Sequence, residues 1–189
     1  MIVFLFGLQI NVLAQIFGFF GLVIMCLSFF QKNKKGYAGV MVIAHIFFAL
    51  EAFVLKGYSN VVTNLVGVLR NGTLVCFLLK KDKDPPKWCI WLFAVLAVSG
   101  AAFFIDSVWA VIPVVCFLLQ CVYLMSKSFM FLKFGSLITE GSMCAYNIFM
   151  GAYIGGIRQV IACTLLIISI VKYKKSLLSE ADAHGTGTC

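Results

Sequence analysis

The chain has 189 residues, of which 62% are hydrophobic and only 12% are charged. A soluble globular domain carries about 25% charged and about 45–50% apolar residues. Together with a mean hydropathy of +1.05, this composition excludes a water-soluble enzyme, a disordered chain and a coiled coil. It predicts an all-α integral membrane protein. The formal net charge of +8 comes from lysines in short gaps between apolar runs, which indicates membrane topology rather than nucleic-acid binding.

Seven apolar runs predict transmembrane helices, each of which needs about 17–25 residues to cross a bilayer. In chain order they cover residues 8–30, 37–55, 61–79, 88–104, 107–125, 129–149 and 153–171. The fourth and fifth runs are separated only by residues 105–106. A polar linker at residues 80–87 holds two prolines, which end the third helix and begin the fourth. We expect residues 172–189 to form a cytoplasmic tail without regular structure.

The lysines predict the orientation of these spans in the membrane. With the N-terminus outside, the outer connections carry only Lys56, and the C-terminus lies in the cytoplasm. Inner connections of membrane proteins carry an excess of lysine and arginine. Those assigned here to the inner side are Lys32, Lys34, Lys35, Lys80, Lys81, Lys83, Lys87, Lys127, Lys133, Lys172, Lys174 and Lys175.

A faint internal repeat divides the predicted spans into two triplets. The sequence at residues 26–32 is similar to that at residues 121–127, and a helix bearing polar residues follows Gly57 and Gly151 in the two halves. We therefore predict a first three-helix repeat at residues 8–79, a linker helix at 88–104 and a second three-helix repeat at 107–171. One crossing helix between two such units gives both the same orientation, as in transporters with parallel repeats.

Five ionisable side chains fall within predicted spans, and each costs about 2.5–3.5 kcal/mol at the centre of a bilayer helix. They are His45, Glu51, Arg70, Glu140 and Arg158. Each therefore needs a partner or a wet cavity.

The polar residues of the third and sixth spans follow helical spacing. Thr63, Asn64, Gly67, Arg70 and Asn71 form one stripe, and Ser136, Glu140 and Asn147 repeat the pattern. We expect both stripes to face the bundle axis, with Gln120 contributed by the fifth span, and Gly18 and Gly21 of the first span to permit close helix packing. The candidate substrate-binding residues are Asn64, Arg70, Asn71, Glu140, Asn147 and Arg158, and the candidate gating or pairing residues are Glu51 and His45.

Two interpretations of these charges stay open at the level of sequence. In the first, arginine–glutamate pairs break and re-form around a cavity that opens to one side at a time. In the second, Arg70 and Arg158 pair permanently with Glu140 and Glu51 and lock the bundle. His45 is either a packing residue or a proton carrier, since histidine changes its charge near neutral pH.

The sequence predicts no catalytic site, metal site or cofactor. The eight cysteines lie mostly inside apolar runs and lack the spacing of metal ligands, so we expect them to act as small apolar residues. No Ser–His–Asp set and no Cys–His pair with a supporting carboxylate is present. An enzyme acting on lipids is accordingly the weakest of the functions considered.

At this point the chain resembles the SWEET/PQ-loop superfamily of small-solute carriers and, more closely, the bacterial inner-membrane proteins of the YgjV type. The likeness is carried by residues 29–32, by Gly57, Asn64 and Arg70, and by residues 146–147 and 151–156. The resemblance implies a multi-pass protein of the bacterial inner membrane, and the superfamily implies facilitated passage of a small polar solute. The chain lacks the Pro-Gln motif, and its first repeat has no proline within a span, which departs from the sugar carriers of this fold.

We therefore expect a SWEET-like carrier of a small polar solute; the alternative is a non-transporting membrane partner or sensor subunit. The expected partners are membrane lipids, the solute and a second copy of this chain, with no nucleic acid. Asn64 and Arg158 occupy matching places after Gly57 and Gly151. This arrangement suggests an anionic or carboxylate-bearing solute.

Overall fold

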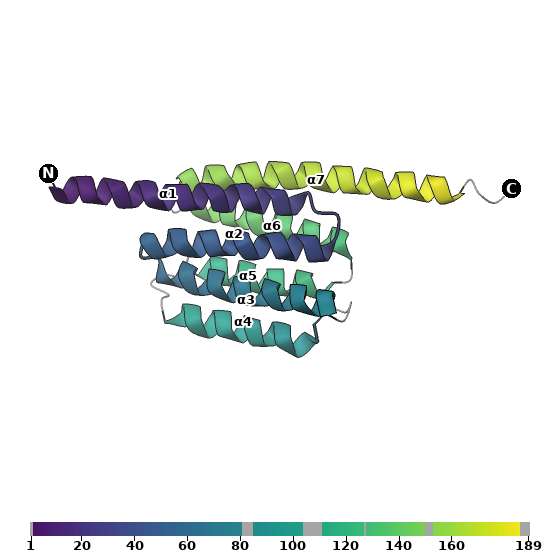
Figure 1. The fold of residues 1–189 in the computed structure, drawn as a ribbon, viewed down its shortest axis with the longest axis horizontal. Helices are drawn as coiled ribbons and strands as arrows, with labels where there is room; N and C mark the ends of the chain where they lie inside the picture. Colours follow the sequence, from purple (N-terminus) through teal and green to yellow (C-terminus); the bar gives the residue numbers. More distant parts are fainter. Residues whose placement is uncertain (1, 81–84, 104–110, 127, 150–152, 186–189) are drawn as a thin grey trace.

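The computed structural model describes residues 2–80, 85–103, 111–126, 128–149 and 153–185. These residues form seven helices, which Figure 1 labels in chain order. The helices are α1 (Ile2–Phe29), α2 (Lys34–Val54), α3 (Tyr58–Lys80), α4 (Lys87–Ala102), α5 (Val111–Met125), α6 (Phe129–Phe149) and α7 (Tyr153–Gly185). The prediction of an all-helical chain is confirmed, while the predicted boundary at residues 105–106 lies outside the described residues.

Four helices in the described part of the chain are long and apolar enough to cross a membrane. Their spans are Val12–Phe29, Lys34–Val54, Tyr58–Lys80 and Gly156–Lys175. Two other helices, α4 and α5, are apolar but shorter, with 16 and 15 residues. The remaining helix, α6, has 21 residues and carries both Lys133 and Glu140. The chain therefore has several membrane-spanning helices, as its composition predicts.

The last helix is longer than its predicted span. It continues to Gly185, so most of the predicted unstructured tail at residues 172–189 is helical as far as the structure describes it. Lysine, leucine, glutamate and alanine between residues 172 and 184 are all good helix formers. Neither glycine nor proline interrupts them before Gly185, the last residue that the structure describes.

Local residues fix the turns between the helices. The Asn33 side chain accepts a hydrogen bond from the backbone N–H of Gly36 at 2.7 Å and caps the start of α2. At the end of α2, Lys56 adopts a left-handed conformation with φ of 59°, and the N–H of Gly57 returns to the carbonyl of Ala52 at 2.8 Å. This arrangement satisfies a carbonyl at the helix end and turns the chain into α3.

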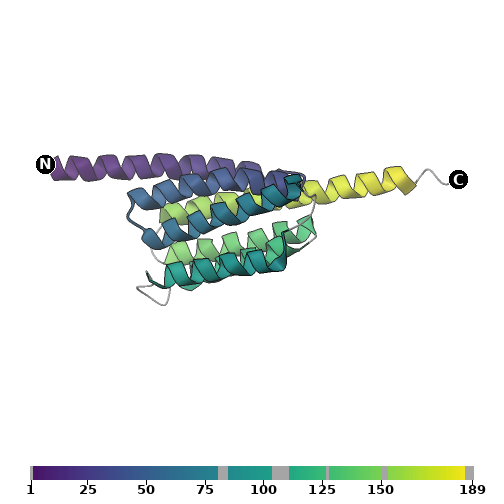
Figure 2. The ribbon, with the colours of Figure 1, turned by 60° about the horizontal axis from the view of Figure 1, so that its bottom comes forward.

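Helices that follow one another in the chain pack side by side. Helix α2 contacts both α1 and α3, and α6 contacts both α5 and α7. Helix α4 contacts α3 and α5, and α7 contacts α1. Figures 1 and 2 show the N-terminal end of α1 and the C-terminal end of α7 extending past the bundle in opposite directions. The proposed equivalence of the triplets α1–α3 and α5–α7 stays a prediction.

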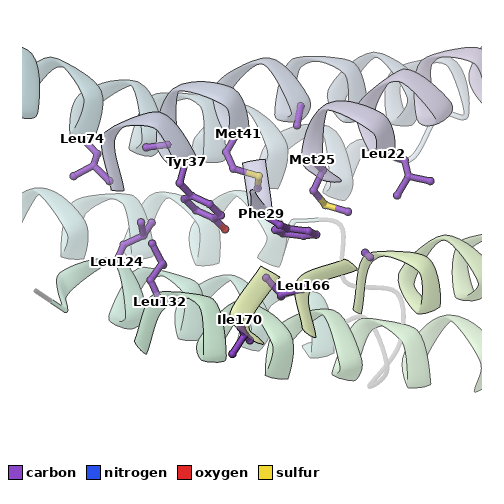
Figure 3. Close-up of a cluster of buried hydrophobic side chains, with 13 residues drawn as sticks. Leu22, Met25, Phe29, Tyr37, Met41, Leu74, Leu124, Leu132, Leu166 and Ile170 are labelled. Atoms are coloured by element: carbon purple, nitrogen blue, oxygen red, sulfur yellow. The ribbon is translucent and has the colours of Figure 1, made fainter. Parts of the chain in front are cut away.

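The main apolar core lies between the two triplets. Figure 3 shows side chains from α1, α2 and α3 facing side chains from α5, α6 and α7. Those labelled there are Leu22, Met25, Phe29, Tyr37, Met41, Leu74, Leu124, Leu132, Leu166 and Ile170. A second cluster holds α4 against α3 and α5, centred on Ile90, Phe93 and Phe117. Because lipid is as apolar as these side chains, close packing rather than escape from water stabilises such contacts in a bilayer.

One lysine assigned above to an inner connection is buried within the bundle. Lys133 lies in α6, where it is 2% exposed, and its Nζ donates hydrogen bonds to the Phe29 carbonyl at 2.8 Å and to Ser169 Oγ at 2.6 Å. The rings of Phe129 and Tyr173 lie about it, with centroids 5.1 and 5.0 Å away. Its assignment to an inner connection is therefore wrong. A cation favours the carbonyls at a helix C-terminus, so Lys133 joins the end of α1 to α6 and α7.

Two glycines of α6 provide a matched test of this packing. A Cβ at Gly135 would overlap the ring of Tyr123 on α5, whereas one at Gly141 would meet no atom of the described residues within 4 Å. We predict that Gly135→Ala lowers the free energy of unfolding by about 1–3 kcal/mol through overpacking. Gly141→Ala should leave it unchanged or raise it, because alanine is the better helix former. Unfolding in mixed detergent micelles measures both, and equal effects of the two variants would contradict the packing.

Candidate functional site

A cavity of about 280 Å³ lies inside the bundle, with side chains from α1, α2, α3, α5, α6 and α7 in its wall. Its volume is just below the range of about 300–1,000 Å³ that is usual for pockets of drug-sized ligands, which suits a small solute. The residues predicted from sequence that line it are His45, Glu51, Asn64, Glu140 and Arg158. These residues come from four helices, so the fold brings together side chains far apart in the sequence.

An ion pair closes part of the cavity wall. Arg158 Nη1 of α7 lies 2.7 Å from Glu51 Oε1 of α2, with side-chain exposures of 29% and 9%. Gly18 of α1 packs directly against the pair, because a Cβ at this position would overlap both Arg158 Nη1 and Glu51 Oε1. Gly18 therefore allows α1 to pack closely, as predicted, and the groups it packs against are the two side chains of the ion pair.

The pair between Arg70 and Glu140, which the interpretation of a permanently locked bundle requires, is not formed. Arg70 instead donates through Nη2 to Gln120 Oε1 at 3.3 Å and through Nη1 to Cys121 Sγ at 3.6 Å. Its guanidinium carbon lies 4.6 Å from the centroid of the Phe117 ring, a distance typical of a cation–π contact. The charge of Arg70 is thus directed toward α5 rather than α6.

Arg70 and Asn71 line a smaller void next to the cavity. This void measures about 10 Å³, and its wall shares Met41 and Gln120 with the wall of the larger cavity. Asn71 is 1% exposed, and neither its Oδ1 nor its Nδ2 has a hydrogen-bond partner among the described residues. The side chain of Asn147, the remaining predicted site residue, lies outside the described side chains.

Polar side chains of α2, α5 and α6 form hydrogen bonds between the cavity and the Lys133 end of the bundle. Gln120 Nε2 donates to Thr139 Oγ1 at 3.5 Å, and the Tyr37 hydroxyl lies 3.1 Å from Ser136 Oγ. Thr139 Oγ1 in turn donates to the Ser136 carbonyl at 2.9 Å. Tyr37 and Thr139 are not among the candidates predicted from the sequence. The position of Thr139 next to Glu140 on α6 is a signal that points to it.

His45 is held by an amide. Its Nδ1 lies 2.9 Å from Asn64 Oδ1, while Asn64 Nδ2 donates to the Asn60 carbonyl at 2.8 Å. This assignment makes Asn64 Oδ1 the acceptor, so His45 Nδ1 carries the proton. His45 Nε2 has no partner among the described groups and faces Gly67, where a Cβ would lie 3.0 Å away. Gly67 thus makes room on α3 for the imidazole ring.

Glu140 differs from the other charged side chains of the cavity. It is 7% exposed and lines the cavity. Within the part of the chain that the structure describes, its carboxyl group takes part in no hydrogen bond or ion pair. Among these residues there is also no cluster of three or more His, Cys, Asp or Glu side chains that could hold a metal ion.

Comparison with known proteins places the chain in a family. The family model Imp-YgjV, described as a bacterial inner membrane protein, matches residues 12–176. This region includes every residue named above as lining the cavity. No curated protein and no solved structure matches the chain.

The ion pair can be tested by removing its partners one at a time. Loss of one partner of a fully buried pair costs about 3–5 kcal/mol. Because Arg158 is partly exposed, we predict that Glu51→Gln or Arg158→Gln lowers the free energy of unfolding by about 1–3 kcal/mol. The double variant should lose less than the sum of the two single losses. Additive losses in mixed micelles would show that the two side chains do not depend on each other.

Proposed function

The chain belongs to the Imp-YgjV family of bacterial inner membrane proteins, and on that premise we propose that it carries a small polar solute across this membrane. Transport would proceed by opening the cavity to one side of the bilayer at a time. We propose further that the N-terminus lies outside, that the C-terminus lies in the cytoplasm, and that α1–α3 and α5–α7 act as two SWEET-like units joined by α4.

The observation on which this proposal depends is the cavity between the two triplets, with Glu51, Glu140 and Arg158 in its wall. Ionisable residues within a membrane are costly and line substrate pathways when they are kept. If the charged side chains only held the helices together, the Arg158–Glu51 pair would be enough for that role. Glu140 has no such structural role, because no described side chain pairs with it.

The polar contacts between the triplets support motion of one triplet against the other. Hydrogen bonds that cross from α1–α3 to α5–α7 join Glu51 to Arg158, Arg70 to Gln120 and Cys121, Tyr37 to Ser136, and the Phe29 carbonyl to Lys133 and Ser169. A rocking motion between rigid units would exchange such side-chain hydrogen bonds and leave the helices intact.

The cavity lies toward one end of the bundle, which supports alternating access. Its wall includes Leu55 and Asn60, which flank the turn between α2 and α3, and the proposed orientation places this turn on the outer side. The Tyr37–Ser136 contact and the Lys133 contacts lie toward the turn between α1 and α2. Opening to the cytoplasm would require these contacts to break.

Thiol accessibility tests alternating access directly. We predict that Asn64→Cys, in a variant without the native cysteines, reacts with a membrane-impermeant maleimide applied to either face in right-side-out and inverted vesicles. Leu69→Cys, on the same helix but 56% exposed on the outside of the bundle, should react from neither face because lipid covers it. Reaction of Asn64→Cys from one face only, or from neither, would contradict a carrier and favour a non-transporting membrane partner.

A further inference from the structure

The charged side chains of the cavity wall do not balance. Glu51, Glu140 and Arg158 are the charged residues among those that line it. Arg158 and Glu51 neutralise each other across 2.7 Å. Glu140 is left as a carboxyl group that is more than nine-tenths buried, lies in the cavity wall and has no partner among the described residues.

The nearest alternative source of positive charge is directed elsewhere. Arg70 does not line the cavity, and two of its nitrogens donate to Gln120 and Cys121 on α5. The ring of Phe117 covers its guanidinium group, and the Arg70 side chain is 4% exposed. A solute in the cavity therefore meets Gln120 before it meets the charge of Arg70.

Several neutral polar groups of the wall are already engaged. Asn64 uses both amide atoms, toward His45 and the Asn60 carbonyl. Gln120 also uses both amide atoms, since it accepts from Arg70 and donates to Thr139. An unpartnered neutral group of the wall is Gln159 Oε1, which is an acceptor. The Glu140 carboxylate and Gln159 Oε1 are both acceptors, so a solute that pairs with them has to donate hydrogen bonds.

The rest of the wall is apolar. Leu22, Met25, Met41, Phe48 and Met143 are among the residues that line it. Methionine side chains are flexible and adapt to the shape of a bound hydrocarbon. A solute that fits this wall has a short apolar part beside its charged group.

We propose that the cavity takes a small organic monocation, a primary amine whose ammonium group donates hydrogen bonds to the Glu140 carboxylate and whose short hydrocarbon part contacts the methionine-lined wall. This inference rests on the proposed function, for which it names the class of solute. It replaces the anionic solute suggested by the position of Arg158 in the sequence, because Glu51 neutralises that arginine.

A set of probes that differ only in the head group tests the proposal on the purified full chain. n-Butylammonium, butyrate and n-butanol share one hydrocarbon tail and are added at equal concentration and ionic strength. A ligand that binds the folded state raises the apparent melting temperature by mass action. We expect n-butylammonium to raise it and butyrate to leave it unchanged, with n-butanol giving a smaller rise than the ammonium. A larger rise with butyrate or n-butanol, or no rise with any probe, would overturn the inference.

Two variants assign the effect to one side chain. Glu140→Gln keeps the shape of the residue and removes its charge, so the affinity for n-butylammonium should fall on the order of tenfold or more. Thr164→Ala serves as the control, because Thr164 is on the exposed side of α7 and hydrogen-bonds the Val160 carbonyl of its own helix; its affinity should match that of the unmodified chain. Unchanged affinity in Glu140→Gln overturns the role of Glu140. If Glu140→Gln fails to fold, the comparison of the three probes on the unmodified chain still decides the charge preference.

The melting experiments test the cation site, and the labelling of Asn64→Cys tests the carrier, so either claim can be contradicted without the other. Selective binding of the ammonium probe together with one-sided labelling of Asn64→Cys would support the cation site and contradict the carrier. Two-sided labelling with preference for butyrate would support the carrier and contradict the cation site.

Discussion

The architecture depends on one constraint: a polar group within a bilayer has to find its partners inside the protein, because lipid offers none. The chain meets this constraint by directing its charged side chains toward the space between α1–α3 and α5–α7. Arg158 donates a hydrogen bond to Glu51, Arg70 donates to Gln120, and Lys133 donates to the carbonyl at the end of α1. Exposed leucine, isoleucine, valine, phenylalanine and tryptophan side chains cover the outside of the bundle.

The same constraint explains why Glu140 stands out. Each of the other buried charged side chains has at least one donor or acceptor among the described residues, whereas Glu140 faces a cavity. A buried charge without a partner destabilises the folded protein unless water or a ligand compensates it. Because Glu140 lies in the cavity wall, a ligand in the cavity that compensates its charge would stabilise the bundle. The proposed class of solute follows from this requirement.

Helical periodicity predicted which side chains share the interior but not which of them touch. Spacing alone places Asn64 and Glu140 on inward faces, and the structure brings both to one cavity. A permanent pair of Arg70 with Glu140, which one of the two interpretations of the sequence requires, is not formed. The relative height and tilt of two helices distant in sequence leave no trace in the spacing of either. The burial of Lys133 is invisible in the sequence for a related reason: its partners, Phe29 and Ser169, are far away along the chain, and one of them is a backbone carbonyl.

The central claim is that α6 turns a wet face to the interior and an apolar face to lipid. Spin labels at Met143→Cys, in the cavity wall, and Ile138→Cys, which is 55% exposed outside, test it in lipid bilayers by power saturation. Both native side chains are apolar, so hydropathy does not distinguish them. The account predicts relaxation by a water-soluble nickel chelate at position 143 and by oxygen at position 138. Greater access of the chelate to position 138 than to position 143 would contradict it.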